Sequence, residues 1–273
     1  MFVEEEKNHV ASHTVVAGVH GELPKQIAYG GLNDDQSPQS VPEVVEGIES
    51  LCAHACALVF ECDKRTPKFD GVGGIENLPQ EESSRYTFVC NHPLGAIDGV
   101  TLGAVLGKHY NGKVKYLVND LLMNLRGLAP LCIPVNKMGK QARNLPVMVE
   151  EAFAGDNHII MFPAGLCSRR IKGVIRDLDW SRSFINKSRK HHRDIVPIHF
   201  IGQNSNRFYT IANLCKWLHL PNFAMALLPD EMYRSRGKHY IVRIGQSIPY
   251  TTFDHTKTSV EWAEFVKQEV YKI

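Results

Sequence analysis

His92 and Asp98 are the two residues whose types and spacing best suit proton-transfer chemistry, and five residues separate them. Pro93 biases the histidine away from helical backbone angles, and Gly95 permits a tight loop that returns the aspartate toward the imidazole ring. A carboxylate held there would bind one ring nitrogen and leave the other free to take a proton from an alcohol that attacks a carbonyl, which contributes roughly 10²–10⁴ in rate. The alternative interpretation is a histidine that only caps the following helix beside an aspartate.

Two apolar runs are expected to bring this pair and a second polar segment to one edge of a sheet. Residues 85–90 lead directly into Asn91 and His92, and residues 158–162 lead into a proline, a glycine and then a serine and two arginines at 168–170. Open α/β sheets bind ligands at the carboxyl ends of their strands. Both polar segments are therefore candidates for one site.

Short β-rich runs alternate with helical patterns along most of the chain. The predicted strands are residues 85–90, 114–118, 131–135, 158–162, 195–200 and 240–245. The predicted helices are residues 99–110, 121–128, 145–154, 180–190, 206–218 and 223–233, followed by a closing helix that begins at Ser259. This alternation predicts an α/β fold with a mostly parallel central sheet and helices on both faces.

The N-terminal part of the chain has a different character. Residues 1–40 are polar, have no sustained period and are predicted to form a loosely ordered arm. Apolar residues at helical spacing predict an amphipathic helix at about 42–62. That helix would open a single domain at 41–273.

Composition favours a reducing compartment and predicts no membrane-spanning segment. The seven cysteines are an odd number without paired spacing, which favours free thiols and a cytoplasmic location. The first residues lack the basic start and apolar run of a signal peptide, and no stretch approaches the ~18 apolar residues of a spanning helix. Any membrane contact is expected to be peripheral.

A basic segment runs from Arg169 to Arg193 in a chain whose net charge is only +2. It holds nine lysines and arginines against two aspartates, a net charge of +7. Such a segment could contact phosphate, anionic lipid headgroups or an acidic partner protein, or it could be a solvated helix face. Nucleic acid is disfavoured because few aromatic residues interleave with the charges.

Four blocks in a fixed order resemble the glycerolipid acyltransferase superfamily, which includes the lysophosphatidic acid acyltransferases. The family's histidine–aspartate block resembles the segment from His92 to Asp98, and its Phe-Pro-Glu-Gly-Thr-Arg-Ser block resembles residues 162–168. Two further blocks resemble residues 134–137 and 196–198, and the resemblance extends from about Lys68 to the C-terminus. It implies a glycerol-3-phosphate acyltransferase-like fold.

The chain departs from these blocks at several positions, which include the phosphate contacts that the resemblance implies. One extra residue precedes Asp98, Ala164 replaces the glutamate, Cys167 replaces an arginine, and Lys137 replaces another. Arg169 could restore a guanidinium, but a lysine lacks the bidentate fork of arginine. The variant is most similar to the hemolysin-like branch of bacterial acyltransferases, and it predicts an unusual acceptor headgroup.

The resemblance implies an O-acyltransferase that moves a fatty acyl chain from acyl-carrier protein or acyl-CoA to the hydroxyl of a lyso-lipid, either a lyso-aminoacyl lipid or a lysophospholipid. His92 would be the general base and Asp98 its orienting partner, with no metal, no cofactor and no covalent acyl-enzyme. The protein would lie on the inner face of the cell membrane. The expected substrate-binding residues are Asn91, Asn136, Lys137, Phe162, Pro163, Gly165, Ser168, Arg169 and Arg170.

Other functions remain as alternatives. Cys90 lies two positions before His92, which could form the Cys/His pair of a thioesterase. Positions 164 and 167 lack the glutamate and the arginine of the family's block. A second alternative is therefore a module that binds a lipid or a carrier protein without catalysing any reaction. A metal site at Cys52, His54 and Cys56 is disfavoured because helical geometry separates these side chains.

Overall fold

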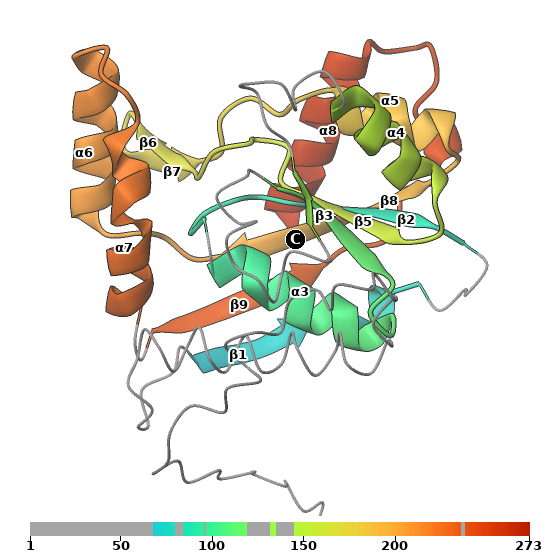
Figure 1. Cartoon of the computed structure of the whole chain (residues 1–273), viewed down its shortest axis with the longest axis horizontal. Helices are drawn as coiled ribbons and strands as arrows, with labels where there is room; N and C mark the ends of the chain where they lie inside the picture. The colour runs from blue at the N-terminus through green and yellow to red at the C-terminus, as the bar shows by residue number, and fades with distance from the viewer. Residues whose placement is uncertain (1–67, 80–83, 96, 119–131, 135–144, 236–237) are drawn as a thin grey trace, which may run out of the picture. The chain divides into compact units, whose positions relative to one another are not determined.

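The computed structural model describes residues 68–79, 84–95, 97–118, 132–134, 145–235 and 238–273 (Figure 1). All of them belong to one compact unit. The predicted arm at 1–40, the predicted helices at 42–62 and 121–128, and Asn136 and Lys137 lie outside the described residues.

Strands and helices alternate along the described chain. The strands are β1 (Lys68–Gly73), β2 (Tyr86–Cys90), β3 (Val114–Val118), β4 (Cys132–Pro134), β5 (His158–Met161), β6 (Arg169–Ile171), β7 (Val174–Arg176), β8 (Asp194–Ile201) and β9 (His239–Ile244). The helices are η1 (Ile75–Asn77), α3 (Ile97–His109), α4 (Leu145–Ala154), α5 (Ser183–Lys190), α6 (Asn206–Trp217), η5 (Phe223–Leu227), α7 (Leu228–Arg234), η6 (Tyr250–Thr252) and α8 (Ser259–Lys272).

The central sheet has seven strands in the order β1-β9-β8-β2-β5-β3-β4, and five consecutive strands from β8 to β4 are parallel. β9 runs antiparallel to β8, and β1 runs parallel to β9. The mostly parallel α/β sheet predicted from the sequence is therefore confirmed. β2 and β5, which precede the two polar segments, are direct neighbours at its centre.

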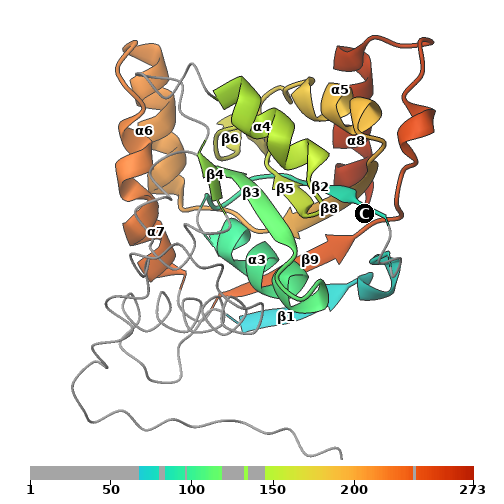
Figure 2. The ribbon, with the colours of Figure 1, turned by 45° about the vertical axis from the view of Figure 1, so that its right-hand side comes forward.

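Helices cover both faces of this sheet, and the alternation of side chains along β2 explains how. Phe88 and Cys90 pack with Leu102 and Leu106 of α3 in one core, whereas Val89 points into a second core with α4, α5 and α8. Figure 2 shows α5 and α8 together on the face opposite α3. β2 is buried on both sides, as expected of a central parallel strand.

Three parts of the fold differ from the sequence prediction. β1 was not among the strands predicted from the sequence. β6 and β7 form a small antiparallel hairpin inside the basic segment, because Lys172 (φ 50°) and Gly173 (φ 83°) both adopt the left-handed backbone of a tight turn. The predicted helix at 223–233 is divided into η5 and α7, because Pro229 in the first turn of α7 lacks the N–H that a continuous helix needs.

Candidate active site

His92 lies at the carboxyl end of β2, where the chain turns into α3. Asp98 stands in the first turn of that helix, and its carboxylate accepts hydrogen bonds from the backbone N–H groups of Leu94 (2.9 Å) and Gly95 (3.1 Å). Gly95 has φ +90°, and a Cβ there would lie 2.7 Å from the sulfur of Cys167. The left-handed glycine therefore lets the loop close tightly although it has one residue more than the family's usual block.

The two side chains form the expected pair. Nδ1 of His92 lies 3.1 Å from Oδ2 of Asp98, whose side chain is fully buried, while the histidine side chain keeps 16% of its surface exposed. Among the residues described, Nε2 of His92 makes no hydrogen bond. One ring nitrogen is thus oriented by the carboxylate and the other is available.

Burial and mutual attraction shift the pKa values of the two members of this pair in opposite directions. Burial disfavours the charged imidazole, but the nearby carboxylate of Asp98 outweighs burial, so the pKa of His92 lies above its ordinary value. Burial also opposes ionisation of Asp98, yet the histidine and the backbone N–H donors hold its pKa below the usual value. Asp98 is therefore still ionised at the pH values at which His92 gains a proton.

The second polar segment closes around the histidine. The ring of Phe162 lies 4.4 Å from the ring of His92, measured between centroids. Gly165 (φ +66°) turns the chain back, and its N–H donates to the carbonyl of Phe162 (2.9 Å). Pro163 is buried, and its carbonyl accepts from the N–H of Ser181 (3.0 Å). Phe162 therefore forms a wall of the site, while Pro163 and Gly165 shape the loop.

Asp177 was not identified as a site residue from the sequence, yet it ties the two segments together. Its buried carboxylate accepts from the Ser168 hydroxyl (2.6 Å), from Nε1 of Trp180 (3.0 Å) and from the backbone N–H of His92 (3.2 Å). The N–H of Ser168 in turn donates to the His92 carbonyl (2.8 Å). Both backbone groups of the histidine are therefore fixed. The only sign in the sequence is an acidic residue within a basic segment.

The other expected substrate-binding residues lie in different surroundings. Asn91 uses its amide on the backbone of Phe200, donating to the carbonyl (2.9 Å) and accepting from the N–H (2.7 Å), and so joins the ends of β2 and β8. Arg170 donates to Asn206 (2.7 Å) and stacks over Tyr209 at the base of α6. Arg169 lies close enough to His92 to oppose its protonation.

The basic segment does not form one continuous outward patch. Arg193 is fully buried and donates to backbone carbonyls, among them those of Phe153 (2.7 Å) and Asn157 (2.9 Å). Lys187 and Lys190 pair with Glu150, whose pKa they lower to about 2. Part of the positive charge of this segment is therefore neutralised or buried within the fold. The remaining cations lie on separate elements, the hairpin and α5, and do not form one surface.

Cysteines and metal-type clusters give no second site in the described part of the chain. The four described cysteines are free thiols. Burial raises the pKa of Cys90 well above its ordinary value, and Asp98 and Asp177 raise it further. Since the thiolate is the nucleophile, this thiol is poorly suited to attack. No group of three metal-ligating side chains occurs among these residues.

Comparison of the sequence with known proteins identifies its family. Residues 54–273 match the sequence model of a family described as "Acyltransferase". A lyso-glycine lipid O-acyltransferase of Phocaeicola vulgatus is 61% identical over 203 residues, which cover 74% of this chain and 72% of that protein. A second one, of Bacteroides thetaiotaomicron, is 62% identical over 203 residues, which cover 74% of each protein.

A solved structure shares the fold. The crystal structure of the 1-acyl-sn-glycerophosphate acyltransferase PlsC of Thermotoga maritima superposes with a TM-score of 0.51 at 15% identity, covering 85% of this chain and 80% of that one. At this identity the likeness concerns the fold alone. Taken with the family match and the two curated relatives, it shows that the chain belongs to the acyltransferase family, within the glycerolipid acyltransferase superfamily, and is an O-acyltransferase.

Proposed function

We propose that this enzyme transfers a fatty acyl chain from a thioester to the hydroxyl group of a lyso-glycine lipid, with His92 as the general base. The identity of 61% and 62% to two lyso-glycine lipid O-acyltransferases supports the acceptor. The observation that carries the mechanism is the His92–Asp98 pair, in which Nδ1 is oriented at 3.1 Å and Nε2 is free of hydrogen bonds among the described residues.

In the proposed reaction, Nε2 takes the proton of the acceptor hydroxyl while its oxygen attacks the thioester carbonyl. Asp98 stabilises the imidazolium that forms. The tetrahedral intermediate collapses, the carbon–sulfur bond breaks, and the departing thiolate recovers the proton from the histidine. An ester and a free thiol result, and no acyl-enzyme is formed. The donor is acyl-carrier protein or acyl-CoA.

The test is a product scan by lipid mass spectrometry. Purified enzyme is incubated with lyso-glycine lipid or with lysophosphatidic acid. Each acceptor is tested once with the acyl thioester of acyl-carrier protein and once with acyl-CoA. We expect one added acyl chain on the glycine lipid with at least one donor. Retained lyso-lipid without any product would indicate a binding module, and free fatty acid released without acceptor would indicate a thioesterase; either result would refute the proposal.

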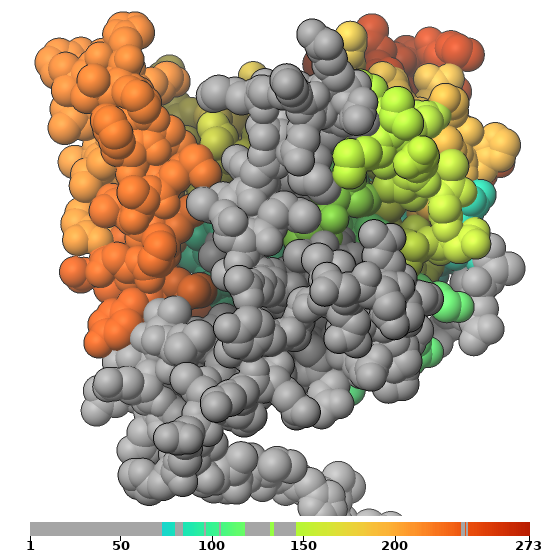
Figure 3. Space-filling view, in the orientation of Figure 1, coloured from blue at the N-terminus to red at the C-terminus, as the bar shows by residue number. Residues whose placement is uncertain are grey.

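An exposed apolar surface supports peripheral contact with the membrane that supplies this lipid. No described helix is long and apolar enough to span a bilayer. Figure 3 shows the atoms of α6, η5 and α7 as one continuous surface at the left edge of the view. The exposed side chains that we call the apolar tip are Leu214, Trp217, Leu218, Leu220 and Phe223.

The arrangement of the apolar tip fits a bilayer interface. Leu214, Trp217 and Leu218 follow helical spacing on the side of α6 opposite its buried residues, and Trp217 is 74% exposed. Tryptophan and leucine at the end of a helix are typical of segments that insert at the headgroup level. We propose that this tip enters the interface.

Vesicle co-sedimentation tests the membrane contact. A Trp217→Ser, Leu218→Ser double variant should bind vesicles at least roughly tenfold more weakly, because two large apolar side chains no longer leave water. Val260→Ser removes an apolar residue of α8 whose exposure of 55% lies between those of Leu218 (46%) and Trp217 (74%), and it is the control. Equal sedimentation of the double variant and the control would contradict the assignment of the tip.

A further inference from the structure

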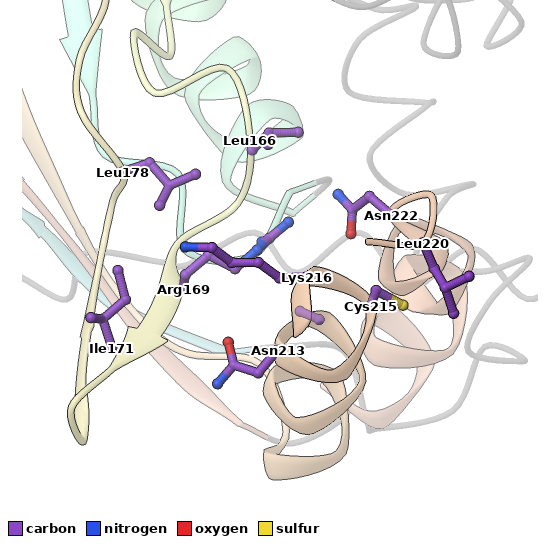
Figure 4. A pocket seen from close by; sticks show the side chains of 10 residues that line it. Leu166, Arg169, Ile171, Leu178, Asn213, Cys215, Lys216, Leu220 and Asn222 are labelled. Carbon is purple, nitrogen blue, oxygen red and sulfur yellow. The ribbon is translucent and has the colours of Figure 1, made fainter. Parts of the chain in front are cut away.

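A pocket of about 210 Å³ lies between the β6 hairpin and the C-terminal half of α6 (Figure 4). Leu166, Leu178 and Leu220 contribute apolar walls. Arg169 and Lys216 are the cationic residues of the lining. No lining residue is acidic. Figure 4 shows Arg169 and Lys216 entering the pocket from opposite sides, the first from the hairpin and the second from the helix.

Some hydrogen-bond donors around this pocket lack acceptors, whereas Nδ2 of Asn213 donates to the carbonyl of Arg170 (3.1 Å). Among the described residues, neither Arg169 nor Lys216 forms an ion pair. Of the arginine's N–H groups only Nη1 makes hydrogen bonds, to the carbonyls of Cys167 (2.6 Å) and Ser168 (3.3 Å), and its guanidinium lies 5.6 Å from the centroid of the Phe208 ring. Nδ2 of Asn222, which also lines the pocket, is inaccessible to solvent and has no hydrogen-bond partner. Two cationic side chains that have no carboxylate partner and line one pocket fit an anionic ligand.

The pocket adjoins the histidine loop. Arg169 directly follows Ser168, whose N–H donates to the carbonyl of His92 at 2.8 Å. An anion bound by Arg169 would therefore lie beside the segment that holds the backbone of His92. This is where the headgroup of an acceptor would be held while its hydroxyl reaches the imidazole.

We propose that this pocket binds the carboxylate of the acceptor's glycine headgroup, with Arg169 and Lys216 as its donors. The inference rests on the proposed function for the identity of the headgroup. A fatty acyl chain can join glycine only through the amine, which leaves the carboxylate free and negatively charged. A planar carboxylate suits the fork of a guanidinium, and the apolar walls accommodate the adjoining methylene groups.

The test measures binding without turnover. N-dodecanoylglycine has no hydroxyl group to acylate, and its methyl ester is its uncharged counterpart. We expect the full-length enzyme to bind the acid at least roughly tenfold more tightly than the ester in calorimetric titrations with monomeric ligand, the effect of a charge-assisted contact. Lys216→Met keeps the length of the side chain but removes its charge, and should abolish most of this preference. Lys172→Met, which removes an exposed charge from the hairpin turn outside the pocket, should retain it.

Kinetics provides the second arm. With lyso-glycine lipid, Lys216→Met should raise KM by about tenfold and change kcat by less than about twofold, since the contact is equally strong in the ground and transition states. Equal binding of acid and ester by the wild-type enzyme, or an unchanged preference in Lys216→Met, would overturn the inference even if transfer proceeds normally. The inference would also be overturned if the wild-type enzyme bound lysophosphatidic acid more tightly than N-dodecanoylglycine and Lys216→Met abolished that binding. The pocket would then be a phosphate site. Absence of transfer by the wild-type enzyme would instead refute the proposed function.

Discussion

Replacing Asp98 by asparagine removes the charge of the pair and leaves its shape nearly unchanged. The carboxylate accepts from Nδ1 of His92 and from two backbone N–H groups through Oδ2, and from the N–H of Gly99 (2.9 Å) through Oδ1. An asparagine oxygen in the Oδ2 position can keep the first three contacts. Its NH₂ group then faces the N–H of Gly99, donor against donor, which should lower the free energy of unfolding by about 1–3 kcal/mol.

The loss of activity should be much larger than this loss of stability implies. A neutral amide cannot stabilise the imidazolium that forms when His92 takes the hydroxyl proton. We expect Asp98→Asn to lower kcat/KM by roughly 10²–10⁴ in a protein that remains folded. Acyl transfer followed by mass spectrometry measures the rate, and thermal unfolding by circular dichroism verifies the fold.

The pH dependence gives an independent readout of the same change. Only neutral His92 can act as the base, so kcat/KM of the wild-type enzyme should rise with pH through a pKa above 6.5. Asp98 raises that pKa, and Asp98→Asn should therefore move the midpoint of the rise to lower pH. Asp254→Asn removes a surface carboxylate that caps the N–H of Thr256, and it should change neither the rate nor the midpoint. An Asp98→Asn enzyme that is folded and keeps more than about a third of kcat/KM, with the midpoint unmoved, would refute the reasoning.

Three further predictions concern the residues around the pair. Asp177→Asn places an NH₂ donor among the buried donors that now bind the carboxylate, so it should lower the free energy of unfolding by about 1–3 kcal/mol. It should also lower kcat by roughly tenfold, because the backbone N–H of His92 loses its acceptor. Urea unfolding and steady-state kinetics measure the two effects, and an unaltered kcat would contradict the positioning role. Cys90→Ala should retain acyl transfer because its buried thiol has a raised pKa, whereas complete loss in a folded protein would point to a thiol nucleophile. Gly95→Ala should lower the melting temperature more than Gly173→Ala; both have positive φ, but only at Gly95 would the added Cβ meet a neighbouring atom, at 2.7 Å.

The sequence alone was sufficient for the fold class and for the contact between His92 and Asp98. Strands such as Val114–Val118 and helices such as Leu145–Ala154 were predicted with their observed bounds, because continuous apolar runs and helical spacing are local properties of the chain. His92 and Asp98 were predicted for the same reason: one short loop with a proline and a glycine brings them together. The family resemblance agrees with the comparisons.

Tertiary structure decided which of the other polar residues share the site. Asp177 reaches His92 across 85 positions of sequence, through a hairpin whose register the sequence pattern did not reveal. Charge counting could not distinguish Arg193, buried on backbone carbonyls, from Arg169, which points its free N–H groups into a pocket with Lys216. Local pattern determines which residues form a strand and the loop after it, whereas the burial and pairing of a charge depend on segments that meet only when the sheet is assembled.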